Sequence, residues 1–419
     1  MVKGDAGSPY AVTDYFDVAP YLADDLESRL EEFQALIDRT HKAGLKVMMD
    51  FVPNHVAREY RGVLGRSDDP SVHWAPENDF FYYPGEALRL PVDCDGYAEM
   101  PAKASGNVFS PAPGINDWWE TVKLNYCDFH TGTWDKMLAA VRYWAAMGVD
   151  GFRCDMVELV PPQFMQWLIA SVKEEFPSVV FVAEVYEKEK YGFYVREVGF
   201  DLLYDKSGLY DTLRAVTCSN ASARGISAAW QFLGDLQPHM LNFLENHDEQ
   251  RLASDFFCGS PEGGYAALAV SLLLNDAPFM LYFGQEAGER GMQAEGFSGL
   301  DGRTSIFDWC TVPALEHPSE AVLERYRSIL ALAKRPAFAT GGCFDLCYCQ
   351  ENGFNPDRHF AWLRSDGRET WLLASNFSDE SAELTLRIPQ EALDCLGIRL
   401  ACTARTLSIP AFDFACIRL

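Results

Sequence analysis

The sequence predicts an α/β protein in which helices cover a parallel, barrel-type sheet, followed by an antiparallel β domain. Three observations support this fold class. A helix, a glycine or proline, and a short apolar strand recur in that order up to about residue 335. A stretch rich in Pro, Gly, Tyr and Trp interrupts the recurrence between about residues 56 and 130. After about residue 335, short strands follow one another without helices between them.

The first helix–strand unit begins at Asp24 or Asp25, either of which can cap a helix. Apolar residues then recur at spacings of four, three and four, which places them on one helical face: Leu26, Leu30, Phe33 and Ile37. Gly44 is a typical helix terminator. The next segment, KVMMDFV at residues 46–52, predicts a buried strand.

Two more units repeat this order. A helix over residues 134–147 is closed by Gly148 and leads into a strand at 149–155. A helix over residues 162–176 leads into a strand at 179–184. With the remaining candidates, the sequence predicts seven barrel strands, at residues 12–17, 46–52, 149–155, 179–184, 200–204, 240–245 and 278–283.

The same pattern predicts three domains. Residues 1–55 and 131–335 form the barrel, residues 56–130 an inserted domain, and residues 336–419 a C-terminal β-sandwich. The inserted stretch is far longer than a typical loop. The C-terminal strands, at residues 360–363, 370–374 and 382–388, are expected to form an antiparallel sheet or sandwich.

The composition of the chain limits its partners. Its net charge is −26, from 35 basic and 61 acidic residues, so nucleic acid and anionic membranes are poor partners, whereas a neutral substrate is compatible. The longest apolar run, residues 266–274, is too short to span a bilayer. Residues 1–20 show no signal-peptide pattern, and the twelve cysteines lack metal-type spacing. Free thiols in a reducing compartment, and hence a cytoplasmic location, are favoured.

Several predicted strands end in polar residues. In a parallel α/β barrel the carboxyl ends of the strands converge on one face, where catalysis takes place. Each polar residue alone has a structural interpretation, such as a helix cap or a loop anchor, but gathering like charges is costly unless chemistry requires it. The residues predicted to line one pocket are His55, Arg153, Asp155, Glu184, His247 and Asp248.

Paired carboxyl groups of different protonation state are typical of glycoside hydrolysis. Arg153 lies two residues before Asp155, on the same face of a strand, which favours the Asp155 carboxylate. Glu184 follows three apolar residues, which favours its protonated form. Hydrolytic metal chemistry is the alternative, yet His55 and His247 lie 192 positions apart, without the close pairing of common zinc motifs.

Six sequence blocks resemble those of one family. They read GSPYAVTDY at residues 7–15, DFVPNH at 50–55, GFRCD at 151–155, AE at 183–184, ENHD at 245–248 and YFGQE at 282–286. In this order they resemble the α-amylase family, glycoside hydrolase family 13. The resemblance implies a (β/α)8 TIM barrel, an insertion domain after the third strand and a C-terminal antiparallel β domain.

The resemblance also implies a retaining mechanism and a role for each matching residue. Asp155 is expected to be the nucleophile, Glu184 the general acid/base and Asp248 the stabiliser of the transition state. Tyr10 is expected to stack on the sugar, and Arg303, in GRTSIFDW, matches loosely an arginine of some members. The residues expected to bind substrate are Tyr10, His55, Arg153, His247 and Arg303.

The sequence departs from the family pattern after the nucleophile. Where many members have a lysine and a histidine, this chain has Glu158 and Leu159. The lysine contributes a sugar contact and the histidine a backbone ligand to calcium. Asn54 matches another calcium ligand of the family, although it can also simply hydrogen-bond loop backbone. We therefore expect no required cofactor and assign no residue as a metal ligand, and calcium stays an open option.

A second departure concerns the start of the chain. The family has a first strand and helix before the GSPY segment, but here only residues 1–6 precede it, and they are not strand-like. The sequence therefore predicts a barrel without its first strand and helix, and with unpaired edges on the neighbouring strands.

Three functions compete on this reading. The leading one is hydrolysis of α-1,4-glucosidic bonds in malto-oligosaccharides or starch, with an α-glucan as the partner. The second is glucosyl transfer or isomerisation by the same chemistry, which depends on water exclusion at the acceptor side. The third is a catalytically inactive, sugar-binding relative. Neither nucleic acid nor a membrane is an expected partner.

Overall fold

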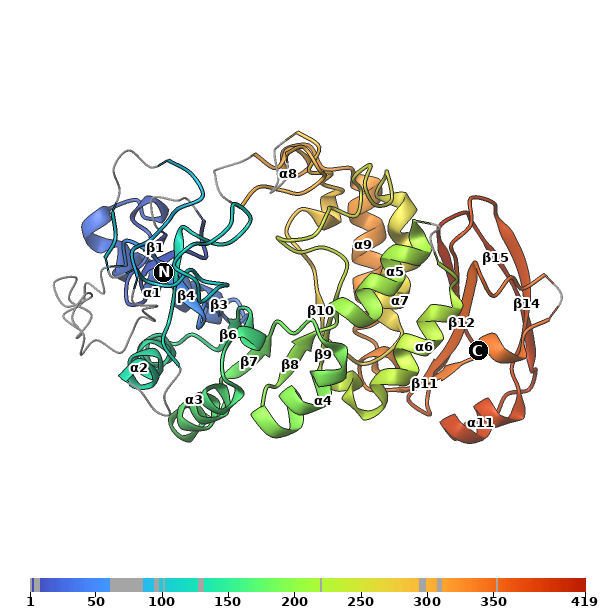
Figure 1. Cartoon of the computed structure of the whole chain (residues 1–419). Coiled ribbons are helices and arrows are strands. Elements are labelled where there is room, and N and C mark those ends of the chain that lie inside the picture. Colours follow the sequence, from blue (N-terminus) through green and yellow to red (C-terminus); the bar gives the residue numbers. More distant parts are fainter. Residues whose placement is uncertain are drawn as a thin grey trace. The chain divides into compact units, whose positions relative to one another are not determined.

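The computed structural model describes residues 2–3, 8–60, 86–93, 98–100, 102–126, 132–218, 221–293, 299–306, 311–351 and 353–419. The chain forms two compact units, Met1–Leu203 and Tyr204–Leu419 (Figure 1). The division into a barrel, an insertion and a C-terminal domain stays a prediction, and part of the predicted insertion lies outside the described residues.

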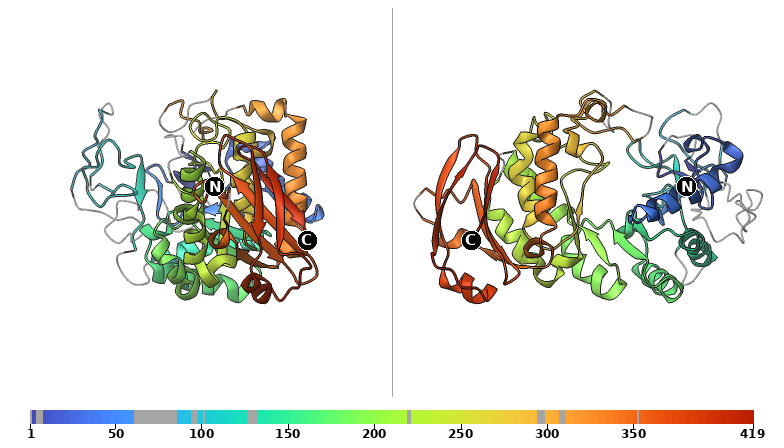
Figure 2. Two further views of the ribbon diagram at one scale, coloured as in Figure 1. Left: turned by 90° about the vertical axis from the view of Figure 1, so that its right-hand side faces the viewer. Right: turned by 180° about the vertical axis from the view of Figure 1, so that it is seen from behind.

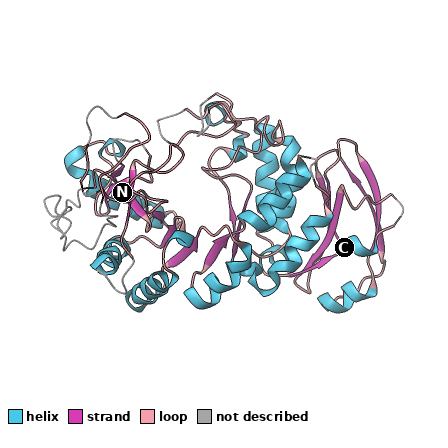
Figure 3. Ribbon diagram, viewed as in Figure 1, coloured by secondary structure: helices cyan, strands magenta, loops and turns pink. Residues whose placement is uncertain are grey.

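A parallel sheet organises the first unit. Its strands lie in the order β3 (Met48–Phe51), β6 (Gly151–Cys154), β7 (Val180–Ala183) and the start of β8 (Leu202–Tyr204). The helices α1 (Arg29–Lys42), α2 (Gly132–Ala146) and α3 (Pro162–Glu175) precede the first three of these strands. A short helix, α4 (Tyr191–Phe193), lies between β7 and β8. The predicted helix–strand units are therefore confirmed (Figure 3).

Local signals set these helix ends. Asp25 accepts a 3.1 Å hydrogen bond from the Glu27 N–H in the helical turn that leads into α1. Gly44, after α1, has a φ of 76°, a conformation that favours glycine. One face of α2 is buried, with Met137, Val141 and Trp144 all in the core.

The prediction that residues 46–52 form a buried strand is wrong for β3. Met48 is 47% exposed, and Asp50 is exposed as well. Among the described residues, β3 pairs in parallel with β6 on one side and with no strand on the other. Phe51, at the carboxyl end of β3, is buried. An apolar run was thus not sufficient to predict burial, because burial of a strand also depends on its place in the sheet.

The N-terminal strands also differ from the prediction. Val12–Asp14 forms β2, which pairs antiparallel with β1 (Val2–Lys3) rather than joining the parallel sheet. The expectations of a barrel strand at 12–17 and of no strand in residues 1–6 are therefore wrong. A turn closed by the hydrogen bond from Ala11 N to Ser8 O, 3.1 Å long, precedes β2. This turn lies within the GSPY segment.

A second antiparallel pair of strands joins the two ends of the inserted stretch. The strand β4 (His55–Ala57) pairs antiparallel with β5 (Thr121–Lys123), and His55 lies opposite Lys123. Every residue of both strands is buried. This pairing fixes His55 and Lys123 in the core directly after β3.

The second unit contains the parallel pair β9 (Met240–Phe243) and β10 (Phe279–Met280). Its longer helices are α6 (Arg224–Leu233), α7 (Tyr265–Leu273) and α9 (Glu320–Ala333). The shorter helices are α5 (Asp211–Thr217), α8 (Pro313–Glu316), α10 (Pro336–Ala339) and α11 (Gln390–Leu396). Among the described residues, no helix is both long and apolar enough to cross a membrane.

Antiparallel sheets form the end of the second unit, as predicted (Figure 2). One sheet has the order β11 (Gly342–Asp345), β12 (His359–Ser365), β13 (Thr370–Asn376) and β16 (Phe414–Arg418). A hairpin of β14 (Ala382–Arg387) and β15 (Ala404–Ile409) packs on it through a shared leucine-rich core. The nine cysteines in the described part of the chain are free thiols.

Candidate active site

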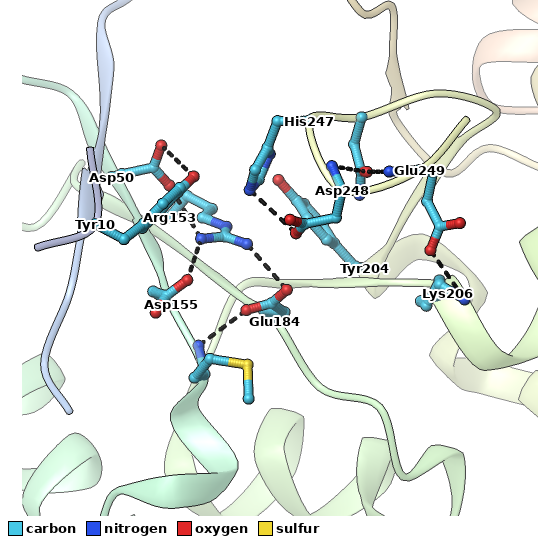
Figure 4. Close-up of polar contacts among 12 residues, drawn as sticks. Tyr10, Asp50, Arg153, Asp155, Glu184, Tyr204, Lys206, His247, Asp248 and Glu249 are labelled. Carbon is cyan, nitrogen blue, oxygen red and sulfur yellow. Dashed lines mark hydrogen bonds and ion pairs between the residues drawn. The ribbon is translucent and has the colours of Figure 1, made fainter. Parts of the chain in front are cut away.

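Arg153 is the centre of the candidate site in the first unit (Figure 4). It is a buried residue of β6, and its Nη1 lies 2.8 Å from Asp155 Oδ1 and 3.3 Å from Asp50 Oδ1. Its Nη2 lies 3.1 Å from Glu184 Oε1. One guanidinium therefore bridges carboxyl groups from the ends of three neighbouring strands.

The parallel register explains why these carboxyl groups meet. Asp50 of β3 lies opposite Arg153 of β6. Just beyond the strands, Asp155 N donates to Phe51 O at 2.9 Å and Glu184 N donates to Cys154 O at 3.1 Å. The backbone ladder thus continues one residue past each strand and holds Asp155 and Glu184 at the rim.

Charge and burial compete at this cluster. Burial lowers the pKa of Arg153, but the carboxylates of Glu184 and Asp50 raise it well above its ordinary value. Burial raises the pKa of Asp155 to about 7; Arg153 opposes this rise and Glu184 adds to it. Arg153 thus acts on the Asp155 carboxyl in the predicted direction, but burial outweighs it and the pKa of Asp155 is raised.

Glu184 has two further partners. Met156 N donates to Glu184 Oε2 at 2.9 Å, and the Tyr186 hydroxyl donates to Glu184 Oε1 at 2.9 Å. Met156 has a φ of 45°, an uncommon conformation for a residue other than glycine, and this turns its N–H toward Glu184. A strained backbone conformation beside a buried carboxyl group is typical of functional sites.

Glu158 supports the loop that carries Tyr186. The Tyr186 N–H donates to Glu158 Oε2 at 2.8 Å, and the Glu187 N–H lies 3.4 Å from Glu158 Oε1. Lys190 Nζ lies 3.8 Å from the same Oε1 atom. In place of the lysine of many family members, this chain therefore has a carboxylate that anchors the loop after β7.

Sequence reasoning missed Asp50, Tyr186 and the anchoring role of Glu158. Asp50 opens the DFVPNH block, so its position was visible although its contact with Arg153 was not. Tyr186 lies two residues after Glu184, a spacing that places both side chains on one side of an extended segment. That spacing was the available signal for Tyr186.

Tyr10 lies beside the cluster. Its hydroxyl is 3.5 Å from Asp50 Oδ2, and the Arg153 guanidinium carbon lies 5.7 Å from the centre of its ring. The ring is half-buried, so part of it is open to a ligand. Tyr10 thus lies beside Arg153, and its stacking on a sugar stays a prediction.

His55 is buried, at 4% exposure, and the centre of its ring lies 5.2 Å from the centre of the Trp118 ring. Burial and the Lys123 charge lower the pKa of His55 to about 3, although a hydrogen bond with the Tyr10 backbone acts in the other direction. His55 is therefore neutral at ordinary pH. Its Nδ1 lies 3.2 Å from Asn54 Nδ2, which links it to the preceding residue.

The calcium that the resemblance raised does not fit the residues present. Asn54 Oδ1 accepts a 2.6 Å hydrogen bond from Lys123 Nζ, and the Leu159 carbonyl oxygen lies 3.4 Å from the same ammonium. A divalent cation at these oxygens would meet a positive charge. In the described part of the chain, moreover, no three His, Cys, Asp or Glu side chains come together as a metal site.

The second unit holds the other predicted residues in the loop after β9. His247 Nε2 lies 3.1 Å from Asp248 Oδ2, while Asn246 Oδ1 accepts hydrogen bonds of 2.9 Å from the N–H groups of Asp248 and Glu249. Arg303 Nε donates to the Asp248 carbonyl at 2.6 Å. Arg303 is thus placed against the backbone of Asp248, a contact that its loose motif match did not predict.

A buried ion pair anchors this loop. Arg251 Nη1 lies 2.9 Å from Glu245 Oε2, and both side chains are almost fully buried. Leu252 N donates to Glu245 Oε1 at 2.8 Å. Burial raises the pKa of Glu245 to about 7, with Arg251 opposing the rise. The pair holds the two ends of the Asn246–Asp248 turn in the core.

The structure thus brings the predicted residues into two groups, one in each unit. The first contains Tyr10, Arg153, Asp155 and Glu184, with His55 close to the Tyr10 backbone. The second contains His247, Asp248 and Arg303.

The site consists of carboxyl groups bridged by an arginine at the strand ends of a parallel α/β sheet. This combination is typical of barrel enzymes whose chemistry is carried out by carboxyl groups. A family described as "Alpha amylase, catalytic domain" matches residues 4–324. The chain belongs to this α-amylase family of enzymes, glycoside hydrolase family 13. The prediction of a TIM-barrel fold with C-terminal antiparallel sheets is confirmed.

Curated relatives are similar at a low level of identity. The α-amylase MalA of Haloarcula japonica is 27% identical over 398 residues, covering 93% of this chain and 50% of the relative. A cyclomaltodextrinase of Geobacillus thermopakistaniensis is 24% identical, covering 99% of this chain and 65% of the relative. A maltosyltransferase of Mycolicibacterium smegmatis is 27% identical over 48% of this chain and 24% of its own length. The chain thus spans less than two thirds of these relatives.

Solved structures share the fold. A cyclic α-maltosyl-(1→6)-maltose hydrolase from Arthrobacter globiformis, in complex with its cyclic substrate, superposes with a TM-score of 0.73 at 20% identity, covering 100% of this chain and 84% of the other. The α-amylase from H. orenii superposes with a TM-score of 0.71 at 18% identity, covering 100% of this chain and 88% of the other. At such identities the similarity shows the fold alone.

Proposed function

We propose that this chain hydrolyses α-1,4-glucosidic bonds of malto-oligosaccharides or starch with retention of configuration. The observation that carries the proposal is the Arg153 bridge, with Asp155 Oδ1 at 2.8 Å and Glu184 Oε1 at 3.1 Å from its two terminal nitrogens. Carboxyl groups held on one guanidinium can reach the same sugar ring. A separation of about 5–5.5 Å between them is what retention requires.

In the first step Glu184 protonates the leaving glycosidic oxygen while Asp155 attacks the anomeric carbon. In the second, Glu184 takes a proton from water, and that water releases the sugar from Asp155. The hydrogen bonds from Met156 N and the Tyr186 hydroxyl hold the Glu184 carboxyl in place for both steps. Arg153 keeps the pair from repelling when both carboxyl groups are charged.

Asp248 is proposed to counter the positive charge that grows on the sugar ring. Its position in the ENHD block supports this role, as does the turn that presents it, fixed by Asn246 and by the Arg303 contact to its backbone. Tyr10, His55 and His247 are proposed to bind the sugar by their positions in the family blocks. For Tyr10, the half-buried ring beside Arg153 supports this assignment.

The names of the relatives support an α-glucan as the substrate class. They include an α-amylase and a cyclomaltodextrinase, and one solved neighbour is a hydrolase bound to maltose. Glucosyl transfer is the second candidate, because a maltosyltransferase also matches 48% of the chain. The identity of about a quarter favours neither reaction over the other.

Incubation with maltoheptaose followed by sugar analysis separates the candidates. Shorter sugars alone support hydrolysis, and longer sugars besides the shorter ones support transfer. Retained binding without any change in the sugar identifies an inactive relative.

Glu184→Gln tests the residue assignment. This variant keeps the shape of the side chain and removes its acid/base function, so turnover should fall by about 10²–10⁴-fold. Turnover at the wild-type rate would remove Glu184 from the mechanism. Glu187→Gln, an exposed neighbour on the same loop, is the matched control and should leave turnover unchanged.

A further inference from the structure

A buried ammonium contacts Asn54, the residue before His55. Lys123 is the last residue of β5 and is only 6% exposed. Its Nζ lies 2.6 Å from Asn54 Oδ1 and 3.4 Å from the Leu159 carbonyl oxygen, and 5.1 Å from the centre of the Phe109 ring. Two oxygens and an aromatic face thus surround this charge, all of which favour a cation.

The orientation of the Asn54 amide is fixed from both ends. Asn54 Nδ2 donates to the Gly106 carbonyl at 2.8 Å, so the oxygen of the amide must face the other way, toward Lys123. Asn54 itself is 1% exposed. The polar atoms of Asn54 are therefore already engaged by groups of this chain.

Lys123 connects segments that carry the predicted site. Asn54 lies between β3 and β4, directly before His55, and Leu159 lies four residues after Asp155, in the helical turn after β6. The antiparallel pair of β4 and β5 places Lys123 opposite His55. One side chain thus joins three segments: the segment after β3, the turn after β6 and the β4–β5 pair.

In the α-amylase family, Asn54 matches a calcium ligand, and the residue at position 159 contributes a backbone ligand. We infer that in this chain the Lys123 ammonium takes the place of that calcium, as a cation built into the fold. Calcium favours about 6–8 oxygen ligands, many of them carboxylates. The described residues at this position instead offer an amide oxygen, a carbonyl oxygen and a fixed positive charge. The inference does not depend on which glucan the chain cleaves.

Thermal unfolding in different metal conditions tests the inference directly. The midpoint is measured for the wild-type chain in excess EDTA, in millimolar calcium and in millimolar magnesium. We expect the same midpoint in all three. A calcium-specific rise that disappears in Asn54→Ala would overturn the inference, because Asn54 would then hold the calcium. A rise that is unchanged in Asn54→Ala comes from calcium bound elsewhere and supports the assignment of Lys123.

Asn54→Asp keeps the test decisive if Asn54→Ala does not fold. In the presence of Lys123 the new carboxylate pairs with the ammonium, so the midpoint should remain insensitive to calcium. If the position instead holds calcium, the added carboxylate strengthens binding, and a larger calcium-specific rise than in the wild type would overturn the inference.

Substitution of the lysine provides the second test. Lys123→Met keeps the length of the side chain but leaves Asn54 Oδ1 without its cation, so the unfolding midpoint in EDTA should fall by several degrees. Lys123→Arg keeps the charge, so its unfolding midpoint should fall less. Lys46→Met, at an exposed lysine just before β3, is the matched control and should leave the midpoint unchanged. A wild-type midpoint for Lys123→Met would contradict the inference.

Discussion

At the scale of single residues, the chemistry depends on how one guanidinium serves two carboxyl groups. Arg153 binds both Asp155 and Glu184, so the charge of each affects the other. The sequence indicated which residues these are, since all three lie in recognisable blocks. It did not indicate that Arg153 is shared, because that contact depends on the register between β6 and β7.

The raised pKa of Asp155 leads to a prediction about pH. Burial and the Glu184 charge raise the pKa of Asp155 to about 7, with Arg153 opposing the rise. Below this pH the proposed nucleophile is protonated and cannot attack, whereas above it the carboxylate is present. The value of kcat/KM for maltoheptaose should therefore fall about tenfold per pH unit as the pH drops below about 7. A pH profile that stays flat between about pH 7 and pH 5 would contradict this reading.

Tyr186 supports a prediction at the same scale. Tyr186→Phe removes the 2.9 Å hydrogen bond to Glu184 Oε1 but keeps the ring. Hydrogen bonds to charged groups contribute about 1.5–3 kcal/mol, so kcat/KM should fall about tenfold or more, and the chain should stay folded with a midpoint lowered by at most a few degrees. Tyr21→Phe, at a tyrosine that is 47% exposed, is the control. Equal kinetics for Tyr186→Phe and wild type would exclude a role for this hydroxyl.

At the scale of secondary-structure elements, the helix–strand units were predictable because helix caps and apolar periodicity are local. The sheet neighbours were not. Met48 is exposed because β3 is paired on one side among the described residues, and Val12–Asp14 pairs with Val2–Lys3 instead of a barrel strand. Both features depend on pairing between segments, which an apolar pattern in one segment does not contain.

The loop after β7 gives a prediction at this scale. Glu158→Ala removes the acceptor for the N–H groups of Tyr186 and Glu187, so the loop should loosen and kcat/KM should fall several-fold. Because Glu158 acts through Tyr186, its effect should shrink in a Tyr186→Phe background, as a double-mutant cycle measures. Strictly additive losses in kcat/KM would show that the two residues act independently.

At the scale of the whole molecule, the C-terminal sheets depend on contacts within the second unit. Trp362 Nε1 of β12 donates to the Leu273 carbonyl at 3.2 Å, at the end of α7. Arg364, also of β12, donates to Leu274 O at 2.9 Å and to Phe338 O at 2.7 Å. The sheet thus supplies partners for carbonyl groups at helix ends.

Arg364→Leu tests the importance of this packing. Arg364 is 1% exposed, and its loss would leave buried carbonyl groups of Leu274 and Phe338 without donors. The free energy of unfolding should drop by about 3 kcal/mol, measured as a lower urea midpoint. Arg368→Leu, at an exposed arginine in the turn before β13, should leave the midpoint unchanged. A wild-type midpoint for Arg364→Leu would mean that these hydrogen bonds contribute little.

The sequence predicted the fold class and the residues of the family blocks, because both are recorded in short local patterns. Lys123 illustrates what it did not predict. This lysine lies outside every recognised block and 69 positions from Asn54, the residue that it contacts. The structure shows this contact because the antiparallel pairing of β4 and β5 places Lys123 opposite His55. Contacts across an inserted segment carry no signal in spacing or composition.

The stereochemistry of the first product tests the central claim most directly. Nuclear magnetic resonance of the sugar released from maltoheptaose, recorded before the anomers interconvert, distinguishes the two outcomes. Attack by Asp155 followed by attack of water inverts the anomeric carbon twice, so the α-anomer should appear first. Initial release of the β-anomer would mean a single displacement by water and would contradict the role of Asp155 as the nucleophile.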